Sequence, residues 1–164
     1  MLQRLIGWLP KPVARTGFQI AHRLRIRLWR ILKPKLRSVS VVATNPQGKL
    51  LLVRTSYGGK NWQFPGGAIE RGELPEVAAK REFEEETGCE VSDVRQLVML
   101  QESVIGTTAT TYIFLGRFDG QPTVDGREIV EADVFARDAL PNGLTERTMA
   151  RVEAFDRDRT TGSQ

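Results

Sequence analysis

The spacing of hydrophobic residues changes near residue 38 of this 164-residue chain. Before that point, segments 2–9 and 18–32 repeat apolar residues at helical spacing, although RLRIRL in the second segment also alternates as a strand would. After it, short apolar runs bounded by turn residues are typical of β-strands. The predicted strands cover residues 38–44, 49–55, 95–104, 111–118 and 129–136. Helices are predicted over residues 75–87 and 144–156.

This order of elements predicts an α/β fold in which helices flank a mixed sheet. We divide the chain into a basic helical extension over residues 1–37, one folded domain over residues 38–157 and a polar tail over residues 158–164. A domain of this length is large enough to bury a hydrophobic core of its own.

The helix predicted over residues 75–87 has clear end signals and one weak point. Pro75 suits the first helical position, and Gly88 suits the left-handed residue just past the end. Leu74 stands where Ser, Thr or Asp would normally cap the helix, and a missing cap typically costs about 1 kcal/mol.

Three glutamates stand on one face of the last turns of this helix. Glu82, Glu85 and Glu86 are spaced i, i+3 and i+4, where like charges repel by roughly 0.2–0.5 kcal/mol per pair. The helix dipole also disfavours anions near a C-terminus. The arrangement is therefore either a solvated acidic face, as most charge runs are, or a site that a cation compensates. Carboxylate oxygens suit Mg²⁺ or Mn²⁺, whereas zinc prefers His or Cys ligands.

A turn with adjacent glycines, FPGG over residues 64–67, precedes the helix and can bring an anionic ligand close to the backbone. From there the spacing runs Gly67, five residues, Glu73, seven residues, then REFEEETGC over residues 81–89. This pattern resembles the Nudix box of the Nudix hydrolase family at every fixed polar and glycine position. Cys89 departs from the family's usual large aliphatic residue, and we expect it to pack as a small hydrophobe.

The resemblance implies a Nudix-type α/β/α sandwich over residues 38–157 and an enzyme that hydrolyses the pyrophosphate bond of a nucleoside diphosphate linked to another moiety. Its cofactor would be Mg²⁺ or Mn²⁺, which neutralises the pyrophosphate and lowers the pKa of bound water. The alternative is a non-catalytic nucleotide-binding regulatory module on the same fold. An intact set of glutamates argues against that alternative, because a pure binder has little reason to tolerate their repulsion.

The same resemblance implies the metal ligands. They are the side chains of Glu82, Glu85 and Glu86, together with the backbone carbonyl of Gly67. Glu85 and Glu86 are also expected to be catalytic, and the sequence does not rank them against each other.

The remaining positions of the box have supporting roles in this interpretation. Arg81 is expected to act in catalysis by orienting carboxylates, with Glu73 as the favoured partner and an ordinary i, i+4 pair with Glu85 as the alternative. Gly72 and Gly88 are expected to shape the loop and the end of the helix.

Residues outside the box complete the predicted site. Glu128 lies in a loop before a predicted strand, where this family often places a further metal ligand or general base, and Glu131 is its competitor. Tyr57, Lys60 and Trp62 precede the box, where they could stack on a base or meet a phosphate, although core packing is the alternative for Trp62.

Family markers of substrate choice are missing here. No proline occurs between Glu90 and Gly120, where ADP-ribose hydrolases carry one, and the tyrosine expected downstream of the box in dinucleoside polyphosphate hydrolases is absent. The substrate stays open among nucleoside triphosphates, nucleotide sugars and related diphosphates.

Charge is distributed unevenly along the chain. Residues 1–37 hold ten Lys or Arg and no acid, which leaves 14 basic and 20 acidic residues in the remainder. The extension could pack on the acidic domain, or it could lie on an anionic membrane surface with Trp8 and Trp29 among the lipid chains. A nucleic-acid-binding arm or an organellar presequence ranks below these two.

Composition limits the remaining function classes. The single cysteine excludes an intramolecular disulfide and suits a reducing compartment, so we expect a cytoplasmic protein that could also contact the inner face of a membrane. The only histidine, His22, gives no basis for a multi-histidine zinc site. No apolar run reaches the roughly 18 residues of a membrane-spanning helix. The sequence does not predict an oligomeric state.

Overall fold

The computed structural model describes residues 13, 16–17, 20–21, 24, 36–57, 61–104, 107–124, 126 and 128–161. The described residues before residue 36 are helical. The rest of the extension expected over residues 1–37 lies outside the described part, except for Leu36 and Arg37, which already belong to the first strand.

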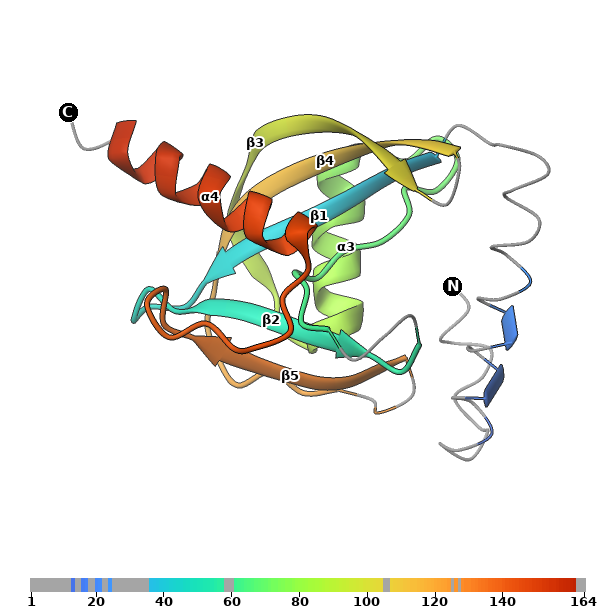
Figure 1. Ribbon diagram of the computed structural model, residues 1–164, viewed down its shortest axis with the longest axis horizontal. Helices are drawn as coiled ribbons and strands as arrows, with labels where there is room; N and C mark the ends of the chain where they lie inside the picture. The colour runs from blue at the N-terminus through green and yellow to red at the C-terminus, as the bar shows by residue number, and fades with distance from the viewer. Residues whose placement is uncertain are drawn as a thin grey trace.

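Five strands form one mixed sheet (Figure 1). In chain order they are β1 (Leu36–Thr44), β2 (Leu50–Thr55), β3 (Val91–Val104), β4 (Thr107–Phe118) and β5 (Ile129–Phe135). Their order across the sheet is β3-β4-β1-β2-β5. β1 and β4 run parallel, and the other neighbouring strands run antiparallel. The mixed sheet predicted from the order of elements is therefore confirmed.

Three strands begin earlier than the hydrophobic pattern predicts, and the cause is tertiary. β4 starts at residue 107 rather than 111, because the polar segment Thr107–Thr110 pairs with β3 through its backbone. Such backbone pairing does not require apolar side chains at every second position. β3 starts at residue 91 rather than 95, and a bulge at Asp93, with φ of 50°, interrupts its alternation. The strand boundaries thus depend on backbone pairing between segments that are distant in sequence.

One helix packs on each face of the sheet (Figure 1). Helix α3 (Pro75–Thr87) has the predicted bounds: Gly88 is left-handed at φ 68°, and its N–H donates to the carbonyl of Glu84 at 2.8 Å. The side chain of Leu74, at the N-cap position, makes no capping hydrogen bond, as expected.

Helix α4 (Glu146–Thr161) starts two residues later and ends five residues later than predicted. Thr145 caps its start, because its hydroxyl oxygen accepts a hydrogen bond from the backbone N–H of Thr148 at 3.1 Å. Ion pairs from Arg95 to Asp158 and from Arg137 to Asp156 hold the final turns against the domain. These partners come from elsewhere in the chain, so the local pattern did not contain them.

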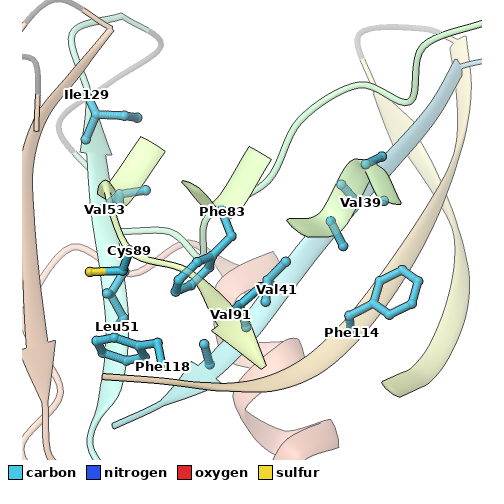
Figure 2. Close-up of a cluster of buried hydrophobic side chains, with 13 residues drawn as sticks. Val39, Val41, Leu51, Val53, Phe83, Cys89, Val91, Phe114, Phe118 and Ile129 are labelled. Carbon is cyan, nitrogen blue, oxygen red and sulfur yellow. The ribbon is translucent and has the colours of Figure 1, made fainter. Parts of the chain in front are cut away.

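Two apolar clusters lie on opposite faces of the sheet. The first joins Ala78, Ala79 and Phe83 of α3 to alternate residues of β1 and β2 (Figure 2). Cys89 belongs to this cluster, so its predicted role as a small hydrophobe is confirmed. The second joins Val152 and Phe155 of α4 to the opposite sheet face. Full burial of one such large side chain contributes roughly 1.5–3 kcal/mol, so these contacts fix both helices on the sheet.

Among the described residues, no helix is long and apolar enough to cross a membrane.

Candidate active site

One cleft of about 1020 Å³ runs between the start of α4, one end of the sheet and the acidic face of α3. The predicted site residues that line it are Tyr57, Gly67, Arg81, Glu82, Glu85, Glu86 and Glu128. They come from three separate segments of the chain, and the fold brings them together in one place.

The last turns of α3 direct three carboxylates toward this cleft. Phe83 anchors the helix because it is fully buried and stacks at a tilt against Phe118, with ring centroids 5.8 Å apart. With Phe83 buried, Glu82 and Glu86 on the same part of the helix lie against the glycine turn, whereas Glu85 is more exposed. The i, i+3, i+4 spacing therefore places all three at the cleft.

Burial makes this group of carboxylates unfavourable when all of them are ionised. The pKa of Glu86 lies well above its usual value, first because the side chain is buried and then because Glu82, Glu128 and Glu85 are negative neighbours. The pKa of Glu82 is raised by burial too, although its contact with Arg81 partly offsets this. The cleft thus concentrates negative charge in a place that water screens poorly.

The glycine turn satisfies part of this charge with backbone groups. The N–H of Gly66 donates to Oε2 of Glu86 at 2.9 Å. Gly67 lies so close to Glu82 that a Cβ built on it would stand 2.5 Å from the carboxylate carbon. No residue with a side chain fits there without displacing Glu82, which explains the second glycine of the turn.

Arg81 links the loop to the helix. Its Nε and Nη2 donate to the two carboxylate oxygens of Glu73 at 2.8 and 3.0 Å, and Nη1 donates to Glu82 at 2.8 Å. A longer ion pair of 3.7 Å reaches Glu85, so both partners considered from the sequence are in contact. The pKa of Glu73 is lowered, mainly by the hydrogen bond from Arg81. Arg81 therefore orients carboxylates while staying fully charged itself.

Two segments meet at Glu128. The hydroxyl of Tyr57 donates to Oε1 of Glu128 at 2.6 Å, and the N–H of Ser56 donates to the Glu128 carbonyl at 2.8 Å. Glu131, its competitor in the sequence analysis, pairs with Arg54 and does not line the cleft. The structure thus places Glu128 with the helix carboxylates.

The three residues expected to meet the substrate are placed differently from one another. Tyr57 lines the cleft, where it contacts Glu128. Trp62 is 6% exposed and packs in the core against Phe135 and Arg54, away from the cleft lining. Lys60 lies outside the described residues. Of the other box residues, Glu73 and Gly72 stay in the loop, and Gly88 ends α3.

The donor set fits a hard divalent cation. Several carboxylate oxygens and the Gly67 backbone stand around one cleft, and burial raises the pKa values of Glu82 and Glu86, so a cation bound there would stabilise their ionised forms. In the part of the chain that the structure describes, no three acidic, His or Cys side chains already have the spacing of a complete metal shell. Arg81 and the Gly66 N–H hold two of the carboxylates instead, so binding a cation would require these side chains to adjust.

The residues at the opposite end of the cleft were not predicted from the sequence. Glu102 of β3, Thr111 of β4 and Arg147 and Arg151 of α4 line it together with Ser38. The one local indication of this end was that β1 and β4 carry polar residues at inward-facing positions, where a strand normally carries apolar ones. Which elements meet there depends on the packing of α4 on the sheet.

Comparisons with known proteins agree with the resemblance found in the sequence. The family model described as NUDIX domain matches residues 34–155. The RNA pyrophosphohydrolase of Saccharophagus degradans is 44% identical over 64 residues, which cover 39% of this chain and 38% of that protein. The RNA pyrophosphohydrolase of Yersinia enterocolitica is 48% identical over 60 residues, covering 37% of this chain and 34% of that protein. The matched segment thus spans little more than a third of the length of these curated relatives.

A solved structure shows a similar fold over most of the domain. The MutT NUDIX hydrolase from Burkholderia pseudomallei aligns with a TM-score of 0.67 and 25% identity, covering 74% of this chain and 98% of that chain. The five-stranded sheet with a helix on each face is therefore an arrangement that this known hydrolase shares.

Proposed function

The chain belongs to the Nudix family, and from this premise we propose that it is a metal-dependent pyrophosphohydrolase acting on a nucleoside diphosphate linked to another moiety. One observation carries the proposal: Glu82, Glu85 and Glu86 of α3 and Glu128 from a distant loop line the same cleft as Gly67 and Arg81. Members of this family generally use a divalent metal. We assign Mg²⁺ or Mn²⁺ because all the candidate ligands are oxygen atoms.

Different residues of the cleft would bind the cation and accept the proton during hydrolysis. Water attacks one phosphorus, the phosphoanhydride P–O bond breaks, and two phosphate-bearing products leave. When bound, Mg²⁺ or Mn²⁺ would neutralise the diphosphate and lower the pKa of the attacking water. Glu82, Glu85, Glu86 and the Gly67 carbonyl would hold the cation, and either Glu128 or one of the helix glutamates would accept the proton.

Two residues of the cleft position the acids rather than react. Arg81 holds Glu73 and Glu82 through three hydrogen bonds, so it fixes the loop against the helix. The hydroxyl of Tyr57 fixes Glu128 at 2.6 Å. Positioning of this kind matters because small displacements of reacting groups reduce rates strongly.

The test is a matched set of three variants in helix α3. We expect Glu85→Gln and Glu86→Gln each to lower turnover on the order of 100-fold or more, because each removes charge that faces the diphosphate and its cation. Glu84→Gln is the control, since Glu84 is exposed on the same helix and does not line the cleft. Equal rates for all four proteins would remove Glu85 and Glu86 from the reaction.

The substrate panel should include nucleoside triphosphates, nucleotide sugars and RNA with a 5′-triphosphate. The last is included because two relatives are named RNA pyrophosphohydrolases. Release of phosphate or nucleotide is measured with Mg²⁺ and with Mn²⁺. Tight binding without turnover across the panel would favour the second candidate, a nucleotide-binding regulatory module.

For location in the cell we propose the cytoplasm, with contact to the inner face of a membrane through residues 1–37. Support comes from the single cysteine, which is buried and unpaired, and from the ten basic residues of the extension.

A further inference from the structure

The sheet face beneath α4 is apolar at one end and polar at the other. In β1, Ser38, Ser40 and Val42 lie on this face, whereas the alternate residues pack against α3, and Thr111 and Ile113 share the α4 face in β4. Val42 and Ile113 pack in the core against α4. The polar residues are enclosed as well, since Ser40 and Thr111 are 5% and 3% exposed. Polar side chains therefore occupy interior positions at the end of the sheet that the cleft reaches.

A carboxylate is the centre of this polar end. The Thr111 hydroxyl donates to Oε2 of Glu102 at 2.6 Å, and the hydroxyls of Ser38 and Thr111 are 3.0 Å apart. Nη2 of Arg151 reaches both oxygens of Glu102, at 3.3 and 3.2 Å, and Nε of Arg147 is 3.9 Å from Oε1. We call these five residues the polar subsite: Ser38, Glu102, Thr111, Arg147 and Arg151.

Stability alone does not explain the polar subsite. A buried ion pair is often no more stabilising than apolar residues of similar volume, because both charges lose their hydration. Desolvation lowers the pKa of Arg151, and its buried Nε has no hydrogen-bond partner among the described residues. Its contact with Glu102 is long and shared between two oxygens, so a better-placed donor could displace it. One N–H of Arg151, a residue of the cleft lining, thus stays without a partner among the described residues.

The position of the polar subsite indicates which part of a substrate it meets. It lines the same cleft as Glu82, Glu85 and Glu86, and the first turns of α4 that carry Arg147 and Arg151 lie over β1 (Figure 1). A nucleotide whose phosphates lie at the helix glutamates would extend its base toward this end. This step rests on the proposed function.

We propose that the polar subsite binds the base of a guanine nucleotide. An ionised carboxylate only accepts hydrogen bonds, and its two adjacent oxygens match two adjacent donors. Guanine offers such a pair at N1–H and the N2 amino group, and it also carries the acceptors O6 and N7, which suit an arginine. Adenine and cytosine offer one amino group beside an acceptor, and uracil offers a single N3–H donor between two carbonyl oxygens.

The test compares GTP, ATP, CTP and UTP as substrates with Mg²⁺. The wild-type protein is expected to favour GTP by roughly 10-fold or more in kcat/KM. Glu102→Gln should lower kcat/KM for GTP by roughly 10- to 100-fold, while the value for ATP changes by less than about 3-fold. Glu153→Gln is the matched control, because Glu153 is exposed on α4 and does not line the cleft.

Binding of GMP and AMP separates failure of this inference from failure of the proposed function. GMP should raise the melting temperature of the wild-type protein more than AMP does, even if no substrate of the whole panel is hydrolysed, in which case only the proposed function fails. Hydrolysis of all four triphosphates at similar rates, or an equal loss on every base in Glu102→Gln, overturns the inference and leaves the function standing. Should Glu102→Gln not fold, equal melting shifts by GMP and AMP in the wild-type protein would overturn the inference.

Discussion

At the scale of single residues, Glu86 stands in surroundings that disfavour its charge. Its side chain is buried, one backbone N–H contacts it, and three acidic neighbours act on it. A protein selected for stability alone would place a neutral residue there, because unpaired buried charges destabilise the folded state. The arrangement fits a residue kept for a ligand of opposite charge, at some loss of stability.

This leads to a prediction about Glu86→Gln in the presence of EDTA. The raised pKa of Glu86 means that the folded state binds its proton more tightly than the unfolded state does. The wild-type free energy of unfolding should therefore fall as the pH rises from 4.5 through the folded pKa, and the variant should show a smaller fall, which Glu82 contributes. At pH 7.5 we expect the variant to be more stable by on the order of 1 kcal/mol, as measured by urea denaturation.

Two comparisons control this measurement. Glu84→Gln removes an exposed carboxylate from the same helix and should leave the denaturation midpoint nearly unchanged. Adding Mg²⁺ should raise the midpoint of the wild-type protein much more than that of Glu86→Gln, because a ligand that binds only the folded state stabilises it. A Glu86→Gln protein less stable than wild type at pH 7.5 in EDTA would contradict the argument from burial.

At the scale of elements, helix α3 is stronger at its end than at its start. Gly88 closes the C-terminus with its N–H bonded to Glu84, whereas Leu74 has the extended backbone of a capping residue but no polar atom in its side chain. Leu74 is 69% exposed, so replacing it leaves no cavity. The start of α3 can therefore be altered without touching the cleft.

Leu74→Ser is predicted to stabilise the protein by about 1 kcal/mol, because the hydroxyl can accept a hydrogen bond from a free N–H of the first turn. Thermal denaturation measures the gain, and Leu74→Ala, which supplies no cap, should show none of it. Catalytic rates should stay within about 2-fold of wild type. If Leu74→Ser and Leu74→Ala have the same melting temperature, the missing cap is not what limits this helix.

At the scale of the whole molecule, a basic extension is joined to an acidic domain. The extension holds ten Lys or Arg without an acid. Val13, Ile20 and Leu24, which are among its described residues, are each more than half exposed. Exposed apolar residues together with many arginines are typical of segments that lie on anionic membranes.

We therefore expect the full chain to sediment with liposomes that contain anionic lipid, and to do so less at high salt. A fragment of residues 34–164 should stay in solution. This fragment starts where the family match starts, because cutting at residue 38 would remove Leu36 and Arg37 from their pairing with β4. Equal sedimentation of the two proteins would show that the extension does not bind membranes.

Features that depend on neighbours along the chain could be predicted from the order of residues alone. Helical periodicity put Glu82, Glu85 and Glu86 on one face, and proline and glycine set the two ends of α3. The pairing of Arg81 with Glu73, eight positions apart, was expected from the family resemblance of this same stretch. Local geometry has few solutions, so such patterns translate directly into structure.

Which distant segments meet depends instead on how the elements pack. Packing separated Glu128, which joins the cleft, from Glu131, which does not, and it enclosed Trp62 against Phe135. It also brought Glu102 to Arg151, 49 residues further along the chain. These contacts depend on how helices seat on a sheet and how strands pair, and the free energies that settle this are summed over the whole core rather than written in any short stretch of residues.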